Sequence, residues 1–109
     1  MRALILSLML VLSPVSAVAG DAGAGAKKSV PCQACHGDTG NKSIDDATPK
    51  IGGQYESYLL QALRDYKSGK RRHLIMSGQV ANLSDVDLRD RAAYFALQPR
   101  EIEDLNGLK

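Results

Sequence analysis

The sequence predicts a small all-α domain with about three main helices joined by long loops. Residues 55–68 carry apolar residues at spacings of three and four, a capping pattern starts another helix at Ser84, and no segment alternates as a strand would. Large apolar side chains are scarce, with one Phe, four Tyr and no Trp. A domain of about 90 residues is marginally stable alone. Long loops and a thin core are reasonable if both wrap around a bulky ligand.

Residues 1–19 have the three-part layout of a secretory signal peptide. Arg2 precedes an uncharged apolar run, and Ala17-Val18-Ala19 supplies the small residues of a cleavage site. The run is short for a membrane span, and an uncleaved anchor is the alternative interpretation. We expect cleavage after Ala19. Residues 20–109 would then be one domain in a bacterial periplasm, where disulfides persist, without stable membrane insertion.

The N-terminal part of this domain is expected to be a short helix followed by a loop. Gly23 and Gly25 weaken the helix, and Pro31 ends or kinks it. Residues 38–54 are rich in turn-forming residues and should be irregular.

The clearest helical signal covers residues 55–68, and Gly69 follows as a stop. Residues 70–83 begin basic, then turn apolar, and are expected to be irregular. The last helix begins at Ser84, an N-cap residue with Asp87 three positions later as in a capping box.

The charge of the domain is nearly balanced. Removing Arg2 from the 14 basic residues leaves 13 against 12 acidic ones. No polyelectrolyte partner is implied, which argues against nucleic-acid binding.

The segment VPCQACHGDTGN, residues 30–41, contains the only two cysteines, Cys32 and Cys35, and His36 follows directly. A Cys-x-x-Cys-His run is the signature of c-type haem attachment. Cysteines three apart can place their sulfurs on the two vinyl-derived positions along one edge of a porphyrin. His36 then lies under the macrocycle with a ring nitrogen able to reach the iron.

Three other interpretations each leave something unexplained. A thioredoxin-like redox pair lacks a strand before Cys32. A zinc site would have only His73 as a further ligand, and a plain disulfide would leave His36 unexplained. We therefore favour one covalent haem c with its iron.

A second axial ligand is expected from Met76, the only methionine of residues 20–109. A thioether sulfur opposite histidine is common in electron-transfer cytochromes c and raises the reduction potential. The other interpretation of a lone methionine is core filling. His73 competes as the sixth ligand, but its basic neighbours suggest a solvated stretch.

Four segments in this order resemble a class I cytochrome c, and more narrowly one half of the two-haem bacterial periplasmic cytochromes. They are CQACHGDTGN, TPKIGGQYESYL, YKSGKRRHLIMSG and LSDVDLRDRAAYFALQ. The resemblance covers nearly all of residues 20–109. It implies a class I cytochrome c fold wrapped around one covalent haem.

The resemblance also implies residue roles. Cys32 and Cys35 would form the thioethers, and His36 and Met76 would be the axial ligands. Pro49 of PKIGG would accept the other N–H of His36 through its carbonyl, with Ile51 where the family has Leu.

The family also packs a small residue of the N-terminal helix against an aromatic of the C-terminal helix. Here these would be Gly23 or Gly25 with Tyr94 or Phe95. Leu74 stands where these relatives often have proline. The motif occurs once, so a two-haem arrangement would need a homodimer or a partner subunit.

The expected function is electron transport by a carrier, not enzymatic catalysis. A quinol–cytochrome c reductase or a dehydrogenase would be the donor, and an oxidase or reductase the acceptor. The alternatives are a haem-c subunit of a larger dehydrogenase, or a haem enzyme or gas sensor with a labile Met76. A basic cluster before Met76 either steers an acidic partner or is a solvated turn. It comprises Lys67, Lys70, Arg71 and Arg72.

Overall fold

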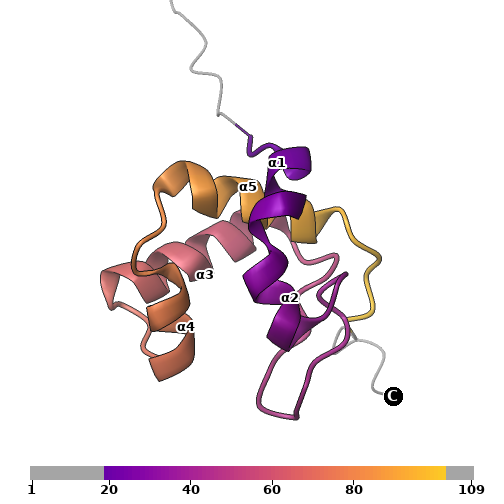
Figure 1. The fold of residues 1–109 in the computed structure, drawn as a ribbon, viewed down its shortest axis with the longest axis horizontal. Helices are drawn as coiled ribbons and strands as arrows, with labels where there is room; N and C mark the ends of the chain where they lie inside the picture. Colours follow the sequence, from indigo (N-terminus) through magenta and orange to yellow (C-terminus); the bar gives the residue numbers. More distant parts are fainter. Residues whose placement is uncertain (1–18, 103–109) are drawn as a thin grey trace, which may run out of the picture.

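The computed structural model describes residues 19–102, which form five α-helices and no strand within that range (Figure 1). The helices are α1 (Ala22–Lys28), α2 (Val30–His36), α3 (Glu56–Ser68), α4 (Leu74–Val80) and α5 (Asp85–Ala96). The all-α prediction is confirmed. The signal peptide predicted for residues 1–19 lies, but for its last residue, outside the described residues, as does the end of the C-terminal tail. None of the helices in the described range has the length and apolar character needed to span a membrane.

The N-terminal helix is divided in two, as the position of Pro31 predicts. Asp21 begins α1 by accepting a hydrogen bond from the Ala24 N–H at 3.1 Å. Ser29 separates α1 from α2, and Pro31 occupies the first turn of α2, where the helix needs no N–H from it. A second helix, α2, therefore begins directly after the break, and it carries the cysteine and histidine motif.

The two helices with the strongest sequence signals form as predicted. α3 ends at Gly69, whose φ of 83° is a left-handed conformation that favours glycine. α5 begins with the predicted capping box: Ser84 Oγ accepts from the Asp87 N–H at 3.1 Å, and Asp87 accepts from the Ser84 N–H at 3.0 Å.

α4 corrects the prediction of an irregular segment over residues 70–83. His73 Nδ1 accepts a hydrogen bond from the Met76 N–H at 3.3 Å, and the His73 N–H donates to Ser77 Oγ at 3.4 Å. These two local bonds start a short helix in which Leu74 and Ile75 are exposed and Val80 is buried. The prediction was wrong for Leu74–Val80, and Met76 lies in a helix instead of a loop.

α1 and α5 cross at Gly25. A Cβ atom at this position would lie 1.9 Å from the Asp90 carbonyl oxygen and 3.0 Å from Tyr94 Cβ. The crossing thus requires glycine, and it selects Gly25 and Tyr94 from the small–aromatic pairs considered above.

The core of the described residues is thin. Leu59, Ala92 and Phe95 form its buried cluster, and the partly buried Cys32 and Ile51 pack against it. Because a cluster this small contributes little burial energy, the fold is suited to a bulky group that extends the core next to Cys32.

Candidate functional site

α2 presents the two cysteines and the histidine on one face, because residues three and four apart are neighbours on a helix. Both thiols are free and half-buried, and His36 is only 7% exposed. Burial raises the pKa of the Cys32 thiol, and the nearby Arg91 guanidinium partly offsets that rise. The Cys32 thiol is therefore held protonated at neutral pH on the helix that carries the buried imidazole.

The Pro49 carbonyl oxygen lies 2.8 Å from His36 Nδ1. A carbonyl only accepts, so Nδ1 carries the proton and Nε2 keeps its lone pair. This bond fixes the tautomer and the ring orientation that a metal-ligating histidine needs.

The loop after α2 folds back on the motif through backbone hydrogen bonds. The Lys42 N–H donates to the His36 carbonyl and the Ile44 N–H donates to the Cys35 carbonyl, both at 3.1 Å. Gly40 accepts from the Ile51 N–H at 2.8 Å. Since Ile51 packs on the Leu59–Phe95 cluster, the loop that presents Pro49 is tied to the core.

Tyr94 of α5 links this helix to the motif through hydrogen bonds, a role that the sequence did not reveal. Its hydroxyl donates to the Asp38 carbonyl at 2.7 Å and accepts from Gln33 Nε2 at 3.3 Å. Two bonds from one hydroxyl therefore join α5 to both α2 and the loop that follows it.

Met76 lies on α4, which packs mainly against α3 (Figure 1). Its side chain is half-buried, whereas its neighbours Leu74 and Ile75 are 94% and 59% exposed. His36 and Met76 thus lie on separate helices, α2 and α4, and the main packing partner of α4 is α3, not α2.

These residues fit a covalently attached haem. The thiols are not joined in a disulfide, the His36 Nε2 lone pair is available, and the core beside Cys32 is small. By contrast, residues 19–102 contain no group of three His, Cys, Asp or Glu side chains arranged to hold a metal ion. The zinc interpretation therefore lacks a ligand set in this part of the chain.

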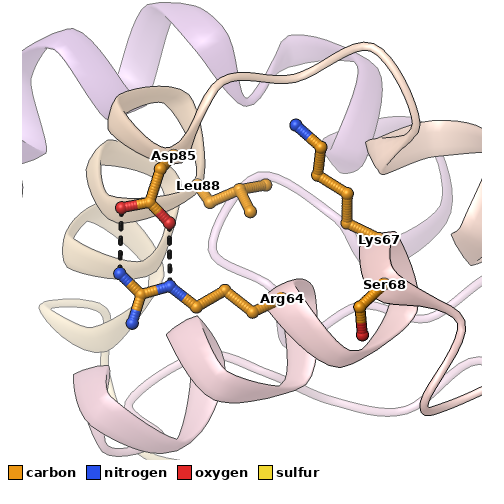
Figure 2. Close-up of a pocket in the computed structure, with 5 residues that line it drawn as sticks. All are labelled: Arg64, Lys67, Ser68, Asp85 and Leu88. Atoms are coloured by element: carbon orange, nitrogen blue, oxygen red, sulfur yellow. Dashed lines mark hydrogen bonds and ion pairs between the residues drawn. The ribbon is translucent and has the colours of Figure 1, made fainter.

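A cavity of about 410 Å³ lies elsewhere, between α3 and α5 (Figure 2). Its polar groups are already occupied: Arg64 forms two bonds to Asp85, at 2.8 and 2.9 Å, and Lys67 donates to the Leu83 carbonyl. We do not assign a ligand to it.

The described residues form a small helical domain that carries two free thiols and a buried histidine on α2, and known proteins of similar sequence are cytochromes c. Cytochrome c4 of Pseudomonas aeruginosa is 47% identical over 104 residues, which are 94% of this chain and 51% of that protein. Cytochrome c-554(548) of Halomonas halodenitrificans is 37% identical over 83 residues, covering 73% of this chain and 99% of that protein.

Among solved structures, reduced recombinant cytochrome c4 from Pseudomonas stutzeri matches with a TM-score of 0.69 and 47% identity, covering 74% of this chain and 47% of that one. The chain spans about half the length of the cytochrome c4 relatives it matches. No protein-family model matches it.

This chain belongs to the cytochrome c family, whose cofactor is covalently bound haem c. The predicted class I cytochrome c fold and the resemblance to one half of the two-haem cytochromes are both confirmed.

Proposed function

We propose that this domain is a periplasmic single-electron carrier whose haem is held by Cys32, Cys35, His36 and Met76. The two thiols would form the thioethers, and His36 Nε2 and Met76 Sδ would be the axial ligands. The observation that carries the proposal is the hydrogen bond from His36 Nδ1 to the Pro49 carbonyl, at 2.8 Å. It prepares Nε2 as a ligand on the same helix face as the two thiols.

When bound, the haem supplies a reversible one-electron couple, and a thioether ligand raises its potential relative to a second imidazole. The chain's own residues provide the rest. Pro49 orients His36, and the burial of His36 limits access of water to the proximal side. His36 and Met76 would together hold the iron and would leave no open position for a substrate, which favours a carrier over an enzyme or gas sensor.

The partners we propose are a quinol–cytochrome c reductase or a dehydrogenase as donor and an oxidase or reductase as acceptor. The surface before α4 suits an acidic protein. Lys70 and Arg72 are exposed, and Arg71 lies over the Tyr66 ring at 4.8 Å. Lys67 is exposed as well, and it keeps its charge while donating to the neutral Leu83 carbonyl. The basic surface therefore consists of Lys67, Lys70, Arg71 and Arg72, and would increase association rates at low salt.

Mass spectrometry of protein matured with haem tests the attachment. The wild type should carry one covalent haem, Cys32→Ser and Cys35→Ser should each lose one thioether, and the double variant should carry none. His73→Ala is the matched control and should retain the haem. A double variant that still carries covalent haem would contradict the assignment.

A redox titration tests the carrier function. The protein should cycle reversibly with one electron, and the reduced form should not bind carbon monoxide at neutral pH. Rapid carbon monoxide binding by the wild type would instead support the alternative with a labile Met76.

A further inference from the structure

Arg91 of α5 is a buried cation that the proposed haem attachment does not use. The residue is only 9% exposed. One guanidinium nitrogen donates to the Asp87 carbonyl at 3.4 Å, and Nε has no hydrogen-bond partner. Guanidinium remains protonated in proteins, so a full positive charge is held here with few partners.

No carboxylate of the described residues forms an ion pair with Arg91. The two acidic residues within one turn of it on α5, Asp87 and Asp90, both bind Lys28 Nζ, at 3.0 and 2.6 Å. Burying an unpaired charge costs free energy unless something compensates. Packing alone does not explain why an arginine stands at this position.

Arg91 lies beside Cys32. It precedes Ala92, a member of the buried cluster against which Cys32 packs, and its guanidinium is close enough to act on the Cys32 thiol. Cys32 is the proposed anchor for one edge of the haem. The buried guanidinium, with no ion pair and an Nε without a partner, therefore lies near the residue to which the macrocycle would be attached.

We infer that Arg91 raises the reduction potential of the haem by placing a fixed, desolvated positive charge at the Cys32 edge. Oxidation adds one positive charge to the haem iron, and a nearby cation opposes that gain. The effect is strong where the effective dielectric constant is low and water is excluded. The inference rests on the proposed attachment of haem at Cys32, and it makes Arg91 a residue that tunes the potential through charge.

Redox titrations of haem-loaded variants test this. In Arg91→Met, the ferric-to-ferrous ratio at a fixed applied potential should rise about tenfold, which is 59 mV for one electron. Arg91→Lys, which keeps the charge, should retain most of the wild-type potential at neutral pH. Equal shifts in the two variants, or none in Arg91→Met, would overturn the inference.

Arg89→Met is the matched control on the same helix. Arg89 binds Asp85 at 2.9 Å with its side chain one-third exposed. Its removal should change the ratio less than about twofold, and salt should abolish that change. The shift in Arg91→Met should persist at high salt, because a buried charge is screened little. A shift that salt removes would contradict the inference.

If Arg91→Met fails to retain haem, the inference is tested on folded, haem-loaded Arg91→Lys by measuring its reduction potential as a function of pH. A buried lysine loses its proton more readily than a free one, so alkali should lower the potential of Arg91→Lys more than that of the wild type. The comparison covers pH values at which both proteins keep sulfur ligation. Parallel pH profiles would overturn the inference, whereas a wild type without covalent haem would contradict the proposed attachment itself.

Discussion

The α2 side and the α4 side of the proposed haem site differ in how the protein holds them. On the α2 side, His36 is buried and bonded to Pro49, and Tyr94 joins α5 to α2 and its loop. On the α4 side, the helix begins at His73 and exposes Leu74 and Ile75. His36 is therefore held by burial and by a hydrogen bond. α4 is held at its C-terminal end by the buried Val80, and it leaves Met76 only half-buried.

Two glycine substitutions test this difference most strongly. Gly40 has a φ of 79°, and a Cβ there would lie 2.8 Å from the Gly52 nitrogen. Gly40→Ala should therefore lower the free energy of unfolding by about 2 kcal/mol or more. Gly78 lies inside α4, and a Cβ there would have no atom within 4 Å. Gly78→Ala should therefore raise the free energy of unfolding by about 0.5–1 kcal/mol. Denaturant titration of both haem-loaded variants measures the contrast, and destabilisation by both would contradict it.

Removing the His73 N-cap of α4 should have the next largest effect on stability. His73→Ala removes the acceptor for the Met76 N–H and should cost about 1 kcal/mol of helix stability. The temperature at which the far-red absorption band of sulfur-ligated ferric haem disappears should fall. His73→Asn keeps a capping acceptor and is the control. Equal damage by both variants would show that the cap does not hold α4.

On the α2 side, Tyr94→Phe deletes the hydroxyl that bonds Asp38 and Gln33. We expect a loss of about 1 kcal/mol in unfolding free energy, the usual net contribution of one hydrogen bond, because the 3.3 Å contact with Gln33 adds little to the 2.7 Å bond to Asp38. The far-red band should be unchanged at room temperature because α4 is not involved. Tyr58→Phe is the control, since Tyr58 is 55% exposed. A similar loss of unfolding free energy in Tyr58→Phe would contradict the role assigned to the Tyr94 hydroxyl.

Low pH should weaken the ion pairs between α1 and α5, and the resulting loss of stability should be smaller than in the variants above. Hydrogen bonding to Lys28 lowers the pKa of Asp87 to about 2, and Lys28 also lowers the pKa of Asp90. Because these folded-state pKa values lie below the ordinary value of 3.8, the stabilisation is complete above pH 4 and is lost as the pH falls toward 2.

Denaturant midpoints measured between pH 6 and pH 2 would show this loss. Lys28→Met should flatten the profile in that window, since it removes the partner that lowers both pKa values. An unchanged slope would contradict the assignment.

The sequence was informative where local chemistry decides the structure. Helix α3 follows from its periodicity and from Gly69, and helix α5 follows from the Ser84–Asp87 capping box, all of which act within a few residues. The contact between His36 and Pro49 was anticipated through the resemblance to a family, because no local rule links residues 13 positions apart.

The parts that the sequence did not reveal depend on less common local bonds or on distant packing. α4 is only seven residues long and exposes Leu74 and Ile75, and its start depends on a histidine cap, which is unusual among N-cap residues. The Tyr94 hydroxyl and the buried Arg91 become informative only when α5 is packed against α2 and its loop. A spacing rule within one segment cannot detect either of them.

The most direct test of the account is the far-red band of the oxidised protein in Met76→Ala, compared with the neighbouring variant Ile75→Ala. Sulfur ligation by Met76 predicts that the band disappears in Met76→Ala and persists in Ile75→Ala, while both retain covalent haem on α2. A band that survives in Met76→Ala would show that another side chain completes the site, and would contradict the proposed role of α4.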